Sequence, residues 1–399
     1  MHNGAKLRRF VLKTNDDDTY YHRACNWILN ATVICEAEEL HLSFKMLSEK
    51  CFFLSPSTFV RVIRLRFYHS ILKLPSPTNS NRFSSLQVLD IRGIRLDPQN
   101  ISDDWVSSLF PVFKKLKLQE VEEISNLSIT SSSLECLKIE ECAFCIVVVS
   151  APRLQSLGVV ICYTDREFDL PPDDLLFRIY APSLQKFSWI DDHYVLNGSS
   201  MCLPTASIDA PSIIWSSATN QNENKNLLLL LQFINHAKSV TLSFVYSCKD
   251  WFTQDSPRYM LDNVQNLEVF CQNFREMSTL ASFFGILSNL KTLTMRCMDR
   301  RCSASNMLLA SETHDFDIEY WESQDVAFIH QLKEANIKVH HSGLEVGLIK
   351  YLIKHAKALN RMTVTFASHF DISRLRRVRE KLSEFYETFS DETLDFVLN

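Results

Sequence analysis

Short segments in which a leucine is followed at +3 and +5 by two further apolar residues constrain the fold of this chain more than any other feature. The spacing occurs at Leu134, Leu154 and Leu184, in SSLECLKI, APRLQSLGV and APSLQKFSW. Because side chains alternate across a strand, the last two apolar residues of each segment face one side and their neighbours face the other. One such unit cannot bury its own apolar face, so the pattern predicts stacked units.

A single match to this spacing means little, because apolar residues make up 46% of the chain and one occurs by chance in roughly one window in ten. Repeated matches in order along the chain are what indicates structural repeats. The spacing returns at Leu86 and at Leu290, and Ala-Pro pairs precede predicted strands at residues 151, 181 and 210. The intervals of about 20–30 residues lie in the range of leucine-rich repeats. The sequence therefore predicts an α/β leucine-rich-repeat solenoid with a curved parallel β-sheet and with helices and irregular returns on its convex side.

A chain of 399 residues is longer than a domain with one compact core usually is. An elongated stack of repeats can still bury a single continuous core, so the length is compatible with a solenoid. Only 20 residues separate Leu134 from Leu154, too few for a strand and a full helix, so the middle repeats are predicted as strand, turn and extended return. The strand pattern already begins at Leu7, which leaves no room for the polar cap a solenoid needs, so we expect an upstream element in the parent architecture. Helices are predicted over residues of about 20–31, 103–110, 227–237, 277–287, 344–358 and 373–386.

Composition excludes several classes of function. The net charge of −5 gives no support for nucleic-acid binding, and no apolar run approaches the roughly 18 residues that span a bilayer. The N-terminus MHNGAKLRRF lacks the apolar region of a secretory signal, so the twelve cysteines are expected to be reduced in the cytoplasm or nucleus. With only 7 glycines, Gly-rich phosphate-binding loops are not expected.

Candidate metal and catalytic residues are few. Cys142 and Cys145 form a CxxC beside Cys136, but zinc needs about four ligands and no second pair with suitable spacing is present. Small core cysteines are the preferred interpretation, and metal or redox use is the alternative. The His340-His341 pair and HDFD at 314–317 are interpreted as solvated loops. Without a nucleophile signature, the chain is predicted to be non-catalytic, with no cofactor and no metal.

Strand alternation gives the positive hypothesis about a site. Residues that flank the core positions should line the concave face of the sheet, and those of the N-terminal half are charged and mainly basic. An acidic segment of a partner protein, or an anionic small molecule, is the expected ligand of that half. The predicted partner-binding residues are Arg64, Arg66, Asp90, Arg92, Lys115, Lys117, Lys138, Glu140, Lys186 and Arg296.

The C-terminal part of the chain resembles a known domain. The segment WESQDVAFIHQLKEANIKVHHSGLEVGLIKYLIKHAKALNRMTV is similar to the FBD domain of plant F-box proteins, and the upstream Ala-Pro-x-Leu segments resemble the irregular leucine-rich repeats of the same family. The resemblance implies a repeat solenoid over residues 1–320 and an FBD domain with a C-terminal cap, continuing the stack, over residues 321–399. The matching positions are Trp321, Leu332, Lys333, Gly343, Glu345, Ile349, Lys350, Tyr351, Leu352, Ala356, Leu359 and Met362.

The resemblance also implies a function. Proteins of this family recognise a target for ubiquitylation by a cullin-RING ligase of the SCF type, through an F-box that docks on a Skp-type adaptor. No F-box-like Leu-Pro-x-x-[ILV] opening precedes the first repeat, so the adaptor is expected as a partner only if an F-box lies upstream. Two alternatives stay open, a repeat module that binds a partner without coupling to a ligase, and a receptor for a small signalling ligand.

Overall fold

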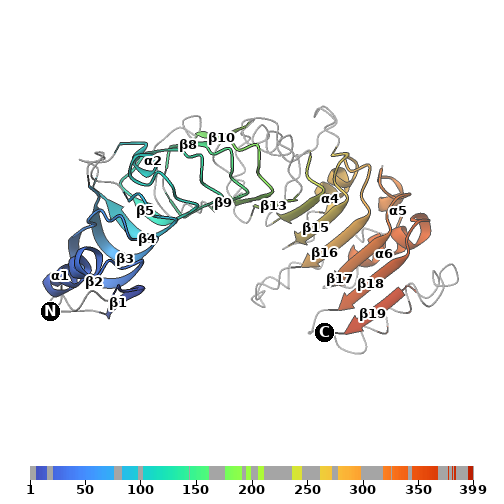
Figure 1. The fold of residues 1–399 in the computed structure, drawn as a ribbon. Coiled ribbons are helices and arrows are strands. Elements are labelled where there is room, and N and C mark those ends of the chain that lie inside the picture. Colours follow the sequence, from blue (N-terminus) through green and yellow to red (C-terminus); the bar gives the residue numbers. More distant parts are fainter. Residues whose placement is uncertain are drawn as a thin grey trace. The chain divides into compact units, whose positions relative to one another are not determined.

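A computed structural model gives the fold, and it is a mixed α/β structure with parallel sheets and few helices (Figure 1). The chain divides into two compact units, Met1–Cys202 and Leu203–Asn399. The domain boundary predicted at residue 320 falls inside the second unit and stays a prediction. The structure describes residues 6–15, 21–75, 83–97, 102–142, 144–160, 176–190, 195–198, 205–210, 236–244, 261–271, 277–297, 318–324, 326–339, 344–366, 376, 380, 382 and 394–398.

The first unit contains a main sheet whose strands lie side by side in chain order and pair in parallel. Apolar side chains point to one face of this sheet, and residues of equal register form continuous rows. Leu89, Leu116 and Leu137 belong to one such row, and each is at most 1% exposed. The strands are β1 (Arg9–Asn15), β2 (Glu39–Phe53), β3 (Val62–Lys73), β4 (Val88–Leu96), β5 (Lys115–Glu122), β7 (Cys136–Glu140), β9 (Ser156–Val160) and β11 (Lys186–Ile190).

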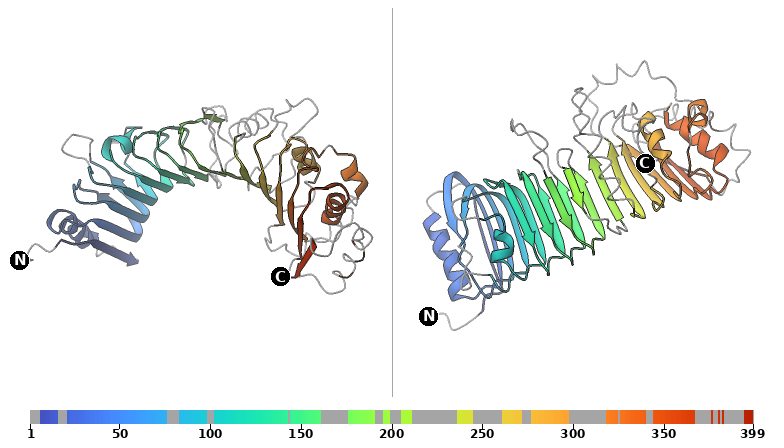
Figure 2. Two further views of the ribbon diagram at one scale, coloured as in Figure 1. Left: turned by 45° about the vertical axis from the view of Figure 1, so that its right-hand side comes forward. Right: turned by 90° about the horizontal axis from the view of Figure 1, so that it is seen from above.

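The apolar face of this main sheet is covered by a second layer, which Figures 1 and 2 show above it. The extended returns predicted between the repeats are present here as strands of a second parallel sheet, in the order β12-β10-β8-β6. Leu127 and Val147 of this sheet are buried, so the core lies between the two sheets. The strands are β6 (Asn126–Thr130), β8 (Ile146–Ser150), β10 (Leu176–Tyr180) and β12 (Val195–Gly198).

Helices take the place of the second sheet over the earlier strands. Helix α1 (Tyr21–Leu29) continues into a π-helical turn, η2 (Asn30–Ile34), and α2 (Trp105–Leu109) follows β4 in the chain. Asp104 precedes α2, and its carboxylate accepts hydrogen bonds from the hydroxyls of Ser102 (2.6 Å) and Ser108 (2.8 Å). Helical spacing in residues 20–31 predicts that Ala24, Trp27, Ile28 and Ala31 lie along one apolar stripe, and this prediction is only partly correct. Ala24, Ile28 and Ala31 are buried, but Trp27 is 42% exposed.

Three residues at one register position of the main sheet adopt left-handed backbone conformations. They are Gly93 (φ 65°), Glu120 (φ 51°) and Glu141 (φ 53°). The register places them together, because Arg92 pairs with Gln119 and Gln119 pairs with Glu140, each one residue earlier. A positive φ is unstrained for glycine and costs other residues about 1–2 kcal/mol. The same left-handed conformation is therefore repeated at one register position, inside β4 and β5 and directly after β7, at a cost wherever the residue is glutamate.

The second unit also contains parallel strands that pair in chain order, from β13 to β19. Their apolar residues again form rows, in which Leu267, Leu293, Ala335 and Met362 are at most 2% exposed. The last strand, β19, was not predicted from the sequence. The strands are β13 (Thr205–Ala210), β14 (Ser239–Phe244), β15 (Asn266–Cys271), β16 (Thr292–Cys297), β17 (Glu334–Val339), β18 (Arg361–Phe366) and β19 (Leu394–Leu398).

Short helices cover one face of this second set of strands, α4 (Met277–Phe284), α5 (Ile318–Glu322) and α6 (Leu344–His355), of which α6 contacts α5 and β17 (Figure 1). Helical spacing in residues 344–358 predicts that Val346, Ile349, Ile353 and Ala356 face inward, and this is correct, since each is at most 5% exposed. The helix predicted at 227–237 lies almost wholly outside the described residues, and so does most of the one predicted at 373–386.

Replacing Glu141 by glycine is expected to raise the free energy of unfolding by about 0.5–1 kcal/mol, because glycine adopts the positive φ without strain and this relief exceeds its entropic cost. Glu141 is exposed, so little packing is lost. The reciprocal change, Gly93→Ala, should lower stability by about 1 kcal/mol. Urea denaturation of both variants checks the pair; a destabilised Glu141→Gly protein would contradict the role given to this backbone position.

Candidate functional site

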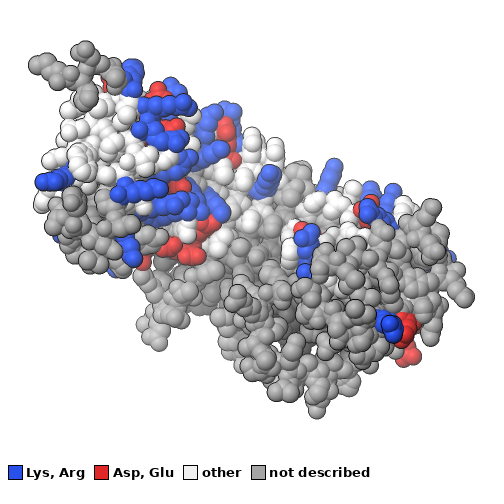
Figure 3. All heavy atoms as spheres, turned by 90° about the horizontal axis from the view of Figure 1, so that it is seen from below, with Lys and Arg blue, Asp and Glu red and all other residues white. Residues whose placement is uncertain are grey.

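The face of the main sheet opposite the core of the first unit, here called the outer face, carries most of the predicted site. Register sorts its side chains into rows that cross the strands. From β1 to β11 the middle row is Val11, His41, Arg64, Asp90, Lys117, Lys138, Gly158 and Ser188. The flanking row towards the strand ends is Lys13, Ser43, Arg66, Arg92, Gln119, Glu140 and Val160. Lysine and arginine side chains gather on this face (Figure 3).

The structure places the predicted residues in two groups. Nine of the ten lie on the outer face of the first unit: Arg64, Arg66, Asp90, Arg92, Lys115, Lys117, Lys138, Glu140 and Lys186. Arg296 belongs to β16 of the second unit, so it is described separately. On β9 the residues of the outer face are uncharged, Ser156 and Gly158. The alkyl chain of Lys138 lies beside Gly158, with its Cγ 3.4 Å from where a Cβ on that glycine would be.

Glu140 links two lysines on the outer face. Lys117 and Lys138 occupy the same register position on β5 and β7, and the Glu140 carboxylate forms an ion pair with both. Burial disfavours the charged form of this carboxylate, but hydrogen bonds from the two ammonium groups outweigh burial and hold its pKa below the ordinary value of 4.5. A bridging carboxylate therefore stabilises two like charges on neighbouring strands, which would otherwise repel each other.

The arginines on β3 and β4 have a different arrangement. Arg92 binds the carboxylate of Asp90 with two hydrogen bonds, from Nε at 2.9 Å and from Nη2 at 3.1 Å. Arg64 lies with Nη1 2.6 Å from Nε2 of His41. Arg66 is exposed, and the described part of the chain supplies it with no acidic partner. This part of the outer face therefore carries more positive charge than its own carboxylates neutralise.

The outer face also extends across β1 and β2, which was not predicted from the sequence. Arg9 donates a hydrogen bond to Glu39 (2.6 Å), and His41 lies 3.6 Å from the same carboxylate. Partial burial and the nearby charges of Arg64 and Arg9 lower the pKa of His41, so the neutral ring accepts from the Arg64 guanidinium. The alternation in ELHLSF would have identified Glu39 and His41, because both flank the buried residues Leu40 and Leu42.

The corresponding face of the second unit is less charged where the structure describes it. Arg296 pairs with Glu268 at 3.0 Å, and its guanidinium carbon lies 5.9 Å from the ring centre of Phe270. Side chains in register with Glu268 are Thr241, Thr294, Asn336 and Thr363. Arg296 is therefore neutralised by its own unit and does not add to the cations of the outer face.

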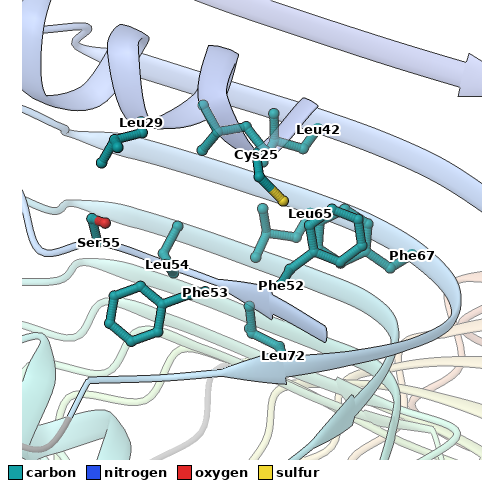
Figure 4. A pocket seen from close by; sticks show the side chains of 11 residues that line it. Cys25, Leu29, Leu42, Phe52, Phe53, Leu54, Ser55, Leu65, Phe67 and Leu72 are labelled. Carbon is teal, nitrogen blue, oxygen red and sulfur yellow. The ribbon is translucent and has the colours of Figure 1, made fainter. Parts of the chain in front are cut away.

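An apolar pocket lies under α1 in the first unit (Figure 4). Its wall includes Phe52 and Phe67, whose rings stack with their centroids 4.7 Å apart. Among the lining residues only Cys25 and Ser55 have polar side-chain atoms. A binding site for a small molecule usually needs several convergent polar groups for orientation. The pocket therefore gives little support to a signalling-ligand receptor.

The thiol of Cys142, in the CxxC motif, lies in the core. The Cys142 side chain is 1% exposed and lies 3.2 Å from the carbonyl oxygen of Glu140, and burial raises the pKa of its thiol to about 12. The described residues contain no group of three or more His, Cys, Asp or Glu side chains that could hold a metal ion. His340, His341 and 314–317 lie outside the described residues. Within the described part of the chain, no helix is long and apolar enough to cross a bilayer.

No protein-family model matches this chain, and no curated protein has a significant match to it.

Replacing Glu140 by glutamine is expected to lower the free energy of unfolding at neutral pH by about 1–2 kcal/mol, with allowance for the partial exposure of Lys138. Because the folded-state pKa is lowered, the contribution is fully present above pH 4.5 and is lost as the pH falls through that value toward the folded-state pKa. Urea denaturation of both proteins from neutral pH to about pH 4 measures the difference. A difference that does not shrink in acid would contradict the ion-pair origin.

Alkylation should separate the cysteines by burial. Cys51 is exposed, whereas Cys142 is buried with a raised pKa. In the native protein, iodoacetamide should modify Cys51 at least about tenfold faster than Cys142, and the difference should disappear in denaturant. Peptide mass spectrometry after timed quenching gives both rates, and rapid native labelling of Cys142 would contradict its placement in the core.

Proposed function

We propose that this chain is a leucine-rich-repeat recognition protein whose outer face binds an acidic segment of a target protein. The observation that carries the proposal is the charge balance across four neighbouring strands, β3, β4, β5 and β7. In the three outer-face rows that contain Val88, Asp90 and Arg92, these strands carry six cations and two carboxylates, Asp90 and Glu140. The cations are Arg64, Arg66, Arg92, Lys115, Lys117 and Lys138. Beyond these rows the charges pair off, Lys73 with Asp97 and Arg95 with Glu122.

Electrostatics supports a protein ligand with acidic side chains. A face rich in one sign of charge raises the association rate of an oppositely charged partner and fixes its orientation. The whole chain has a net charge of −5, so the excess of cations in these rows is opposite in sign to the charge of the molecule. Strands fixed in register also hold the cations at regular intervals of about 4.8 Å, which suits an extended or helical acidic segment.

The architecture supports the same proposal. In a solenoid each unit contacts its neighbours only, and the stacked strands leave one broad face for a partner. The parallel strands in chain order, the alternating burial and the return strands β6, β8 and β10 are consistent with such repeats. We propose a solenoid through residue 320, with an FBD-like domain over residues 321–399 continuing the stack as a cap.

Delivery of the bound target to an SCF-type ubiquitin ligase is the role that we propose for the protein, as the resemblance to F-box/LRR/FBD proteins implies. In that role the chain is non-catalytic and acts in the cytoplasm or nucleus, with ubiquitin transfer on a separate enzyme. Coupling requires a Skp-type adaptor, and an F-box upstream would supply its docking site. The alternative is a recognition module that binds the same acidic segment without a ligase.

Reversing three cations on the outer face is expected to reduce target capture at least about tenfold, because each reversal turns an attraction into a repulsion. Arg66, Lys115 and Lys186 suit this test, since none has an ion-pair partner among the described residues. The matched control reverses Arg153, Lys238 and Lys357, which are exposed and lie off the face, and changes the net charge equally. Pull-down from an extract followed by mass spectrometry compares the variants; equal loss in both would contradict the assignment of the face.

Co-purification with a Skp-type adaptor separates the proposed role from its alternative. An adaptor that co-purifies with the full-length protein and its captured targets supports ligase coupling. Targets captured without any adaptor favour the uncoupled module.

A further inference from the structure

Two pairs of like charges occupy matching register positions on neighbouring strands of the outer face. Lys117 on β5 pairs in register with Lys138 on β7, and Arg66 on β3 pairs with Arg92 on β4. Like charges placed opposite each other on neighbouring strands destabilise a sheet unless an anion lies between them. The lysine pair has that anion, because the Glu140 carboxylate contacts both ammonium groups.

The arginine pair has no comparable bridge among the described residues. The Asp90 carboxylate is held by Arg92 through two hydrogen bonds, at 2.9 and 3.1 Å, in a side-on geometry that uses both carboxylate oxygens. The described chain places no carboxylate on Arg66, which is exposed. Arg64, two residues earlier on the same strand, contacts the neutral ring of His41 and adds a third cation. The formal charges of these three arginines and of Asp90 sum to +2.

We propose that Arg66 and Arg92, assisted by Arg64, bind the phosphoryl group of a phosphorylated side chain in the target protein. The bound phosphoryl group takes the place between the arginines that Glu140 takes between the lysines. This inference rests on the proposed function, because it names the chemical group of the target that the outer face selects.

Charge and geometry favour a phosphoryl group over a carboxylate. A phosphorylated side chain carries about −1.5 to −2 charges at neutral pH, which matches the net charge of the arginine cluster, whereas a carboxylate carries only one. Its three terminal oxygens can accept from two guanidinium groups at once, and arginine binds phosphate with two parallel hydrogen bonds. Neighbouring parallel strands are about 4.8 Å apart, so guanidinium groups on β3 and β4 can reach one phosphoryl group.

The test uses the full chain and three pools of short synthetic peptides with degenerate flanks and a fixed central residue, phosphoserine, aspartate or serine. Fluorescence anisotropy at low salt measures binding of each pool. We expect the phosphoserine pool to bind at least about fivefold more tightly than the aspartate pool, and the serine pool to bind most weakly. Competition with inorganic phosphate and with free phosphoserine distinguishes recognition of a phosphopeptide from capture of a small phosphate compound.

Variants locate the site. Arg66→Gln and Arg92→Gln should each reduce the preference for phosphoserine over aspartate to within about twofold, and Arg66→Lys should give an intermediate preference, since it keeps the charge but loses the fork. The control Lys115→Gln, on the same face but outside the cluster, should weaken the phosphoserine and aspartate pools equally and leave the preference unchanged.

Three outcomes would overturn the inference: no preference in the unaltered protein, a preference that survives Arg66→Gln, or no measurable binding of any pool. Free phosphate that competes as strongly as free phosphoserine, with no contribution from the peptide flanks, would also count against a phosphopeptide. Equal binding of the phosphoserine and aspartate pools would remove the phosphoryl site but leave the outer face as a surface for acidic segments. Failure of the proposed function is recognised differently, by target capture that survives the triple charge reversal.

Discussion

The in-register stacking of parallel strands is the constraint on which the structure of the first unit depends. A row of apolar side chains crosses the main sheet at one register position, and a second row lies two residues further on. The first row is Leu40, Ile63, Leu89, Leu116, Leu137, Leu157 and Phe187, and each member is at most 2% exposed. A slip of one residue in any strand would turn both of its core side chains outward. The register is therefore fixed by burial.

Fixing the register on the buried side also fixes it on the outer face, where charge decides the energetics. Arg66 must lie opposite Arg92, and Lys117 opposite Lys138, whatever their mutual repulsion. The protein neutralises the lysine pair with its own Glu140. The arginine pair is the position where an anion from another molecule contributes most, and it is where we propose that target recognition is selective. Core packing and recognition thus share one geometric cause.

The residues that carry the resemblance to the FBD domain are mainly core residues. Trp321 is 0% exposed and packs near Phe284 and Tyr351, with ring centroids 6.1 and 6.4 Å away. Leu332, Leu352 and Met362 are equally buried. Such positions preserve a fold, whereas function depends on the groups at the surface. The resemblance in this part of the sequence therefore supports a type of fold. The proposal about recognition depends on the outer face of the first unit.

The sequence by itself determined which side chains are buried and which face outward, because alternation along a strand is a local property. The spacing at Leu134, Leu154 and Leu184 therefore predicted the core correctly, and the same rule found nine residues of the outer face. Trp27 was wrongly predicted to share the buried stripe of its helix and strand β19 was not predicted, since helix-face exposure and strand pairing depend on what packs against them.

Only the tertiary structure decided which charges meet. Glu140 forms ion pairs with lysines on two strands, and Arg92 donates hydrogen bonds to Asp90. No carboxylate of the described residues pairs with Arg66. Some of these pairings join residues of one strand, as Arg92 and Asp90 do, and others join neighbouring strands, as Lys117 and Glu140 do, and which of them form depends on the exact register and on side-chain reach. A single sequence contains no signal for either, because each charged residue fits a solvated strand face equally well with or without its partner.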